Sequence, residues 1–135
     1  MQVLVNLKDL RPNNWFINQA KLEKVREAWL QGKQDILPSV LISKIDGSLA
    51  LIDGHSRAYA AFENGQTMIT ADQQELCDIE GLLALYEYIH RLGPSKGIRT
   101  IADLASRIVS PQDHHSLWIN WCTKWIEQHS SSDDL

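Results

Sequence analysis

Residues 53–57, with the sequence Asp-Gly-His-Ser-Arg, place a carboxylate, an imidazole, a hydroxyl and a guanidinium around a single glycine. A glycine lets a ligand approach the backbone closely, and the three side chains that follow it can donate hydrogen bonds to anionic oxygens. The segment therefore predicts a phosphate site. Its binding residues would be Gly54, His55, Ser56 and Arg57. Asp53 and His55 are the candidates for catalysis, because either could handle a proton or a Mg²⁺ ion.

The flanking residues predict a strand that leads directly into a helix at this glycine. Leu49 to Ile52 form a short apolar run typical of a strand, residues 59–62 continue as a helix, and Gly65 is suited to end it. The first amides of a helix have no internal partners and carry a partial positive charge, which favours bound phosphate. Two plainer interpretations stay open: Arg57 pairs with a surface carboxylate, or Asp53 is an ordinary helix N-cap.

Other local signals indicate a small set of strands and one more helix before residue 72. Residues 1–6 predict a strand, and Asn18 is a suitable N-cap for a helix that runs through Gln31. The Asp-Gly pair at 46–47, between two β-rich runs, is typical of a two-residue hairpin turn. Residues 67–70 predict the last strand of the sheet.

The order of these elements and motifs resembles the ParB/sulfiredoxin superfamily. The matching parts are a Leu-Arg-Pro-Asn-Asn box at 10–14, the helix at 21–31, the Leu-Pro-Ser-Val-Leu-Ile run at 37–42, and the pattern Gly54, Arg57 and Ala60. The resemblance implies an α+β fold over residues 1–72, with a small mixed sheet and flanking helices. It also implies a nucleotide site at the Gly54 helix start, to which Asn13 of the box would contribute.

Departures from the family patterns distinguish between its branches. His55 stands where sulfiredoxins carry their reactive cysteine, so the resemblance excludes sulfiredoxin chemistry. Only Gly54 and Arg57 remain of the Gly-Glu-Arg-Arg box that holds CTP in chromosome-partitioning members, which argues against a CTP clamp of that kind. The Asp-Gly-His-x-Arg turn is similar to that of the free-serine kinases, although residues 15–19 lack the acidic general base that those enzymes need.

Two classes of function follow from the resemblance and the chemistry of the turn. In the first, the chain is a small phosphotransferase or nucleotide hydrolase, in which Arg57 and the helix amides stabilise phosphoryl charge and Mg²⁺ accompanies the nucleotide. In the second, the same site senses a nucleotide without catalysis, and a helical segment reports binding to a protein partner. The Asp-Gly-His-x-Arg match favours the first class.

Residues 73–130 carry only helical signals, and residues 131–135 form a polar tail that we expect to fray. Helices are predicted at 79–91, from a capping box at 100–103 to about residue 108, and from a Ser-Pro start at 110–111 to about residue 128. The last helix carries a stripe of three tryptophans, Trp118, Trp121 and Trp125. The stripe either packs against the rest of the domain, which is the commoner role, or forms a surface for a protein partner.

Length and charge agree with a small cytoplasmic protein. The chain has 135 residues, of which 44% are hydrophobic, enough for one domain with a helical appendage. It shows no secretory leader, and no apolar run approaches the ~18 residues needed to span a bilayer, so we expect no membrane association. With 17 acidic and 13 basic residues, the net charge of −4 argues against direct DNA binding.

The cysteines and histidines lack the spacing of known metal sites. Cys77 and Cys122 are far apart, so we expect two buried free thiols and no disulfide, zinc, haem or iron–sulfur site. His114 and His115 are adjacent, and adjacent helical side chains point about 100° apart, so one metal is poorly served by both. His90 has no ligand at metal-binding spacing and is predicted to be a surface residue.

Overall fold

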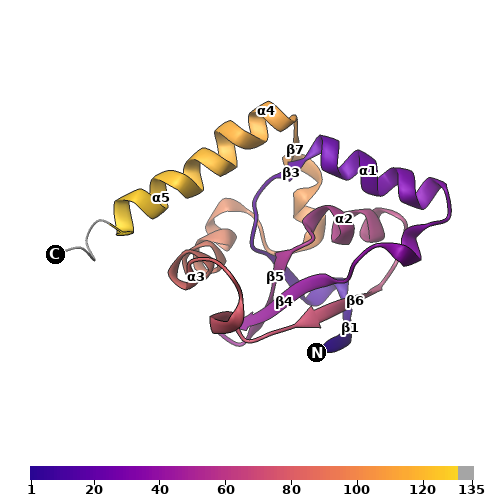
Figure 1. Ribbon diagram of the computed structural model, residues 1–135, viewed down its shortest axis with the longest axis horizontal. Helices are drawn as coiled ribbons and strands as arrows, with labels where there is room; N and C mark the ends of the chain where they lie inside the picture. Colours follow the sequence, from indigo (N-terminus) through magenta and orange to yellow (C-terminus); the bar gives the residue numbers. More distant parts are fainter. Residues whose placement is uncertain (131–135) are drawn as a thin grey trace.

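Five strands form a mixed sheet in the order β1-β6-β4-β5-β2 in the computed structural model, which describes residues 1–130 (Figure 1). The strands are β1 (Gln2–Asn6), β2 (Leu10–Pro12), β4 (Val40–Ile45), β5 (Ser48–Asp53) and β6 (Met68–Gln73). The pairs β2–β5 and β4–β6 are parallel, whereas β1–β6 and β4–β5 are antiparallel. The architecture is the α+β class with a small mixed sheet that the sequence predicts. The frayed tail predicted at 131–135 lies outside the described residues.

The β4–β5 hairpin places the end of β5 at the predicted site. Asp46 and Gly47 both have positive φ, 52° and 81°, which is the backbone geometry of a two-residue hairpin turn. Val40, Ile42 and Leu51 bury their side chains in the core. Because β5 is clamped between β4 and β2, its last residue is held firmly at the point where the next helix begins.

Two helices, α1 (Gln19–Leu30) and α2 (His55–Glu63), lie side by side over the sheet (Figure 1). The predicted cap of α1 is confirmed, since the Asn18 side chain accepts hydrogen bonds from the backbone amides of Ala20 and Lys21. Arg26 and Glu63 join the two helices through contacts of 2.6 and 2.8 Å. The alanine-rich inner face of α2 is fully buried, which lets the helix pack closely on the strands.

The second half of the chain is helical, with one short strand. α3 spans Leu83–Leu92, and α4 (Pro111–His114), a π segment (His115–Ile119) and α5 (Asn120–Ser130) form one helical run that projects past the body of the molecule (Figure 1). Shorter 3₁₀ helices occupy Leu7–Asp9, Gln34–Ile36, Leu76–Asp78, Gly93–Lys96 and Ile101–Arg107. The predicted Ser110 cap of the last run is present, since its hydroxyl accepts from the amide of Asp113.

Two predicted helices differ from the structure. α3 begins at Leu83 rather than Ile79, because Gly81 has a φ of 123° and the Tyr86 hydroxyl donates a hydrogen bond to the carbonyl of Glu80, which holds the preceding turn out of a helix. The helix predicted after Thr100 has its capping box but is 3₁₀ rather than α. No helix within residues 1–130 is both long and apolar enough to cross a membrane.

A short parallel bridge ties the two halves together. β3 (Ile17–Asn18) pairs with β7 (Ile108–Val109), directly before α1 and α4 respectively. The helical run then packs on the domain through its tryptophans: the Trp15 ring lies 5.3 Å from Trp118 and 5.0 Å from Trp121. The packing role predicted for the tryptophan stripe is therefore confirmed.

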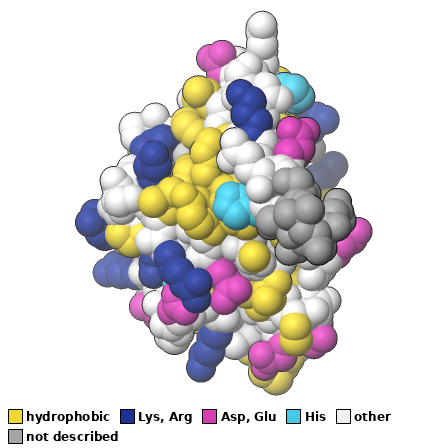
Figure 2. Space-filling view, turned by 90° about the vertical axis from the view of Figure 1, so that its left-hand side faces the viewer, with side chains coloured by type: hydrophobic (Ala, Val, Ile, Leu, Met, Phe, Trp, Pro, Cys, Tyr) yellow, Lys and Arg dark blue, Asp and Glu magenta, His cyan; other side chains and the backbone are white. Residues whose placement is uncertain are grey.

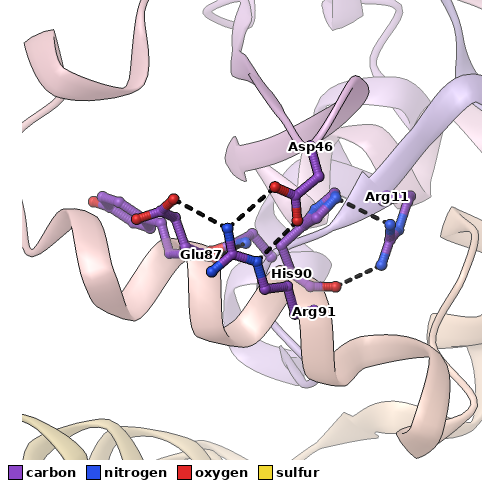
Figure 3. A network of polar contacts seen from close by, with 7 residues as sticks. Arg11, Asp46, Glu87, His90 and Arg91 are labelled. Atoms are coloured by element: carbon purple, nitrogen blue, oxygen red, sulfur yellow. Dashed lines mark hydrogen bonds and ion pairs between the residues drawn. The ribbon is translucent and has the colours of Figure 1, made fainter.

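A polar network fixes α3 against β2 and the hairpin (Figure 3). Arg11 Nη1 lies 3.0 Å from His90 Nε2, and Arg11 Nη2 donates to the His90 carbonyl. Arg91 pairs with Asp46 at 2.9 and 3.1 Å and with Glu87 at 3.3 Å. His90 is 1% exposed, so its predicted surface position is wrong: the contact with Arg11, distant in sequence, draws it inside.

The predicted burial of the two thiols is also wrong. Cys77 is exposed and Cys122 is half-buried, and both are free. Cys77 follows β6 in a short 3₁₀ turn at the surface. Cys122 lies in α5, where partial burial raises the pKa of its thiol to about 11.

Candidate functional site

Gly54 starts α2 in a left-handed conformation, with φ 97° and ψ 30°, and is its N-cap. A Cβ at this position would lie 2.7 Å from Val40 Cγ1, so both the backbone angle and the packing require glycine. No side chain caps this helix. Asp53 is therefore not the N-cap that one interpretation of the sequence suggested, and its side chain is 75% exposed.

A cavity of about 390 Å³ opens at this helix start. All five residues of the 53–57 turn line it. Its other polar lining residues are Asn14, Asn18, Lys21 and His114, and its apolar walls are Phe16, Ile17, Val25, Leu37 and Pro38. The cavity thus joins the turn to the start of α1, the loop before β4 and the start of the C-terminal helical run.

Arg57 is held at the cavity by backbone carbonyls. Its Nη1 donates to the carbonyl oxygens of Pro38 at 2.7 Å and Ser39 at 2.9 Å, and its Nη2 lies 3.5 Å from the Asp53 carboxylate. Within residues 1–130 these contacts leave the Nε–H and one Nη2–H of the guanidinium without an acceptor. Arg57 therefore combines a structural role in the loop before β4 with donors for an anionic ligand.

His55 faces the interior of the domain. Its side chain is 7% exposed, and Nε2 accepts a hydrogen bond from the backbone N–H of Asn13 at 3.1 Å. Burial lowers the pKa of His55 to about 4; the Arg57 charge adds to this effect, while Asp53 and the backbone of Leu51 oppose it. The ring is neutral near pH 7, and this geometry supports a structural role rather than proton transfer.

Asn13 lies beside the turn but not in the cavity. It is 4% exposed, and its Nδ2 donates to the carbonyl of Tyr86 at 3.0 Å, so the side chain points toward α3. Its backbone N–H is shared between His55 and the carbonyl of Leu51, 3.0 Å away. Asn13 thus supports the turn from behind, whereas the neighbouring Asn14 lines the cavity.

Nine of the fourteen lining residues were not predicted as site residues, and Lys21, Asn14 and His114 are three polar ones among them. Lys21 lies in the first turn of α1 after the Asn18 cap, a position at which a cation would face ligand bound near that helix start. Asn14 follows the predicted Asn13 by one residue. His114 comes from α4, beyond the segment that carries the family resemblance, and no local pattern could have placed it here. Lys21 and Arg57 together outnumber the single carboxylate of the lining, Asp53.

The side chains of the tryptophan stripe pack mostly against the rest of the domain. Trp118 and Trp125 are buried and Trp121 is half-buried. Trp125 packs against Tyr88 of α3, with ring centroids 5.4 Å apart. Figure 2 views the molecule from the side of α3 and α5 and shows hydrophobic side chains gathered there. Exposed apolar residues such as Leu83 and Ile126, more than the tryptophans, would form any partner surface on this side.

Comparison with known proteins gives partial structural matches. No known protein family matches the chain, and neither does a curated protein sequence. Among solved structures, protein Atu1540 from Agrobacterium tumefaciens matches with 17% identity and a TM-score of 0.46, over 56% of this chain and 38% of that one. Sulfiredoxin from Arabidopsis thaliana matches with 18% identity and a TM-score of 0.46, over 56% of this chain and 85% of that one.

Proposed function

We propose that this protein binds a phosphate-bearing ligand, a nucleotide, with its phosphates at the Gly54 helix start. The observation that carries the proposal is the cavity in which that helix start, Arg57 and Lys21 meet. The helix amides and the two cations favour an anion, and only Asp53 opposes it. A volume of about 390 Å³ lies in the range of small-molecule sites.

The lining also suggests how such a ligand would lie. The uncommitted Nε–H and Nη2–H of Arg57 could each donate to a phosphate oxygen, because a guanidinium binds anions in a bidentate manner. The apolar side chains of Phe16, Val25 and Leu37 would then pack against the base or the sugar. A phosphate at one end and a flat aromatic base, whose faces can pack on apolar side chains, at the other are the two parts of a nucleotide.

Phosphoryl transfer is a second candidate, and Asp53 is the observation that favours it. Asp53 lines the cavity, is 75% exposed and lies within reach of Arg57. No cluster of three or more His, Cys, Asp or Glu side chains suited to a metal occurs within residues 1–130. Mg²⁺ commonly binds to one or two carboxylates together with the phosphates of its nucleotide, a set that Asp53 would complete. Arg57 and the helix amides would stabilise the transferring phosphoryl group.

A thermal-shift panel of ATP, ADP, CTP and GTP, with and without Mg²⁺, tests the proposed function. A ligand at 100 times its dissociation constant adds about 2.7 kcal/mol of stability, so a bound nucleotide should raise the melting temperature clearly. Lys21→Ala should reduce that rise. Lys24→Ala is the matched control, because Lys24 is exposed on the same helix and does not line the cavity. An unchanged melting temperature across the panel, or equal behaviour of the two variants, would contradict the proposal.

A further inference from the structure

The helical run at 111–130 changes its hydrogen-bonding pattern directly after His114. Residues 115–119 form a π segment, whereas α4 and α5 on either side are α-helical. In an uninterrupted α-helix, residues 114, 121 and 125 would fall on one face. A π turn holds an extra residue, so it rotates the part after it by about 100° relative to the part before it. π segments occur frequently at functional sites.

This rotation separates two tasks of the run. Before the π segment, His114 lines the cavity at the Gly54 helix start. After it, the Trp121 ring packs at a tilt against Trp15, and Trp125 packs against Tyr88. The extra residue thus lets one helical run face the cavity at its start and the aromatic core beyond.

His114 is held in place by the residues that precede it in the sequence. Its backbone N–H donates to the carbonyl of Ser110 at 2.8 Å, and the β3–β7 bridge fixes Ile108–Val109 beside Ile17–Asn18. These backbone contacts place residue 114 next to the loop that leads into α1. Its side chain is buried, with 8% exposure, yet it contributes to the wall of the cavity.

The surroundings of His114 are short of negative charge. Burial is the main effect that lowers its pKa, Lys21 and the adjacent His115 add to it, and the backbone of Phe16 opposes it. Arg107 lies over the Phe16 ring at 5.2 Å, and the other charged or titratable groups of the cavity are Asp53, His55 and Arg57. A phosphate in the cavity would add the negative charge that these surroundings lack. The protonated form of His114 would then become more favourable.

We propose that His114 contacts the ligand's phosphates and takes up a proton from solvent when the ligand binds. The inference deepens the proposed function and rests on it. Gly54 with Arg57, and Lys21 with His114, would then form two anion-binding groups in one cavity, which fits a di- or triphosphate better than a monophosphate. The helical run at 111–130 becomes part of the binding site rather than an appendage.

The experiment uses inorganic triphosphate as the probe and the full chain. NMR of the imidazole rings should show that saturating triphosphate raises the titration midpoint of His114 but not that of His115, which is exposed and does not line the cavity. Calorimetry in buffers of different ionisation enthalpy should show proton uptake that His114→Asn loses and His115→Asn keeps. Triphosphate affinity should fall about tenfold in His114→Asn, the lower end for a lost hydrogen bond to a charged group.

The outcomes separate the two proposals. If wild-type protein binds triphosphate and Lys21→Ala weakens it, but the His114 midpoint does not move, the inference about His114 is overturned while the site stands. If triphosphate does not bind at all, the proposed function itself fails. Because the NMR titration uses wild-type protein, it decides the question even if His114→Asn does not fold.

Discussion

The imidazole Nε2 of His55 accepts a hydrogen bond from the backbone N–H of Asn13, across 42 positions of sequence. This contact joins the box at 10–14 to the turn at 53–57, the two motifs from which the site was predicted. Because the same N–H also points to the carbonyl of Leu51, the three segments are locked behind the helix start. A neutral imidazole is required, since a protonated ring would have no lone pair to accept this bond.

The folded protein should therefore lose stability in acid through His55. The unfolded chain binds a proton near pH 6.5, whereas the folded pKa is about 4, so protons favour the unfolded state between these values. The free energy of unfolding should fall by about 3 kcal/mol over this window because of His55 alone. Urea denaturation at several pH values, with His55→Gln compared to wild type, measures it. An equally steep loss in His55→Gln would show that other groups are responsible.

Gly54→Ala should destabilise the fold even without a ligand. Its φ of 97° disfavours any side chain, and the new Cβ would press on Val40. We expect a loss of at least about 2 kcal/mol, the cost of a left-handed alanine plus the contact. Adding Val40→Ala removes the nearest atom that the Cβ meets, Val40 Cγ1, so the double variant should lose less than the sum of the two single losses. Strict additivity in a double-mutant cycle would argue against this contact.

Arg57→Lys should weaken both the ligand site and the loop before β4. Lysine has three donors on one nitrogen, so it cannot make both carbonyl contacts, to Pro38 and Ser39, and also bind a phosphate in a bidentate manner. Nucleotide affinity should fall by about 1.5 to 3 kcal/mol, the range for hydrogen bonds to charged groups. Hydrogen exchange without ligand should show faster opening at the amides of Ser39 and Val40. Lost affinity with unchanged exchange would mean that Arg57 serves the ligand alone.

Asp53→Asn should separate binding from catalysis. Asp53 is exposed and caps no helix, so the variant should fold as well as wild type. If the site only binds, removing this repulsive charge should raise affinity for ATP without Mg²⁺ a few-fold, as expected for an exposed charge. If the site transfers phosphate, Mg²⁺-dependent turnover should drop instead. Asp78→Asn, an exposed carboxylate outside this cavity, is the control and should change neither.

Arg11 and Arg91, the two arginines of the network in Figure 3, should contribute unequally to the stability of the fold. Arg11 bonds both the ring and the carbonyl of buried His90, so Arg11→Ala should cost about 2 kcal/mol of stability and loosen α3. Arg91→Ala should have little effect, because its ion pair with Asp46 is exposed on both sides. Chemical denaturation of the two variants compares them directly. A larger loss for Arg91→Ala would reverse this assignment.

Features set by neighbouring residues could be predicted from the sequence. The Asn18 and Ser110 caps, the Asp46-Gly47 turn and the strand that breaks at Gly54 are confirmed, because each depends on backbone preferences of a few adjacent residues. The small mixed sheet was implied by the resemblance of the motif order to a known superfamily, and the sheet with its parallel pairs β2–β5 and β4–β6 is present. The five residues at 53–57 all line one cavity because they are adjacent in the sequence.

Features that depend on distant contacts could not be predicted in this way. His90 is buried by Arg11, and His114 reaches the cavity through the β3–β7 bridge; neither has a local signal. The π segment also lacks one, since ordinary helical spacing describes its tryptophans equally well. His55 looked available for chemistry because its type and spacing are visible in a sequence, whereas the direction in which it points depends on Asn13.

The two-residue bridge between Ile17–Asn18 and Ile108–Val109 also has a consequence for how the chain folds. It closes a loop of roughly ninety residues and gains only a few hydrogen bonds. Such distant pairings form slowly, because the chain loses the entropy of closing the loop before the contacts stabilise it. The sheet and its hairpin, which are made of nearer contacts, should therefore assemble early. The last helical run would dock afterwards, and its tryptophan fluorescence should report that late step as a separate kinetic phase.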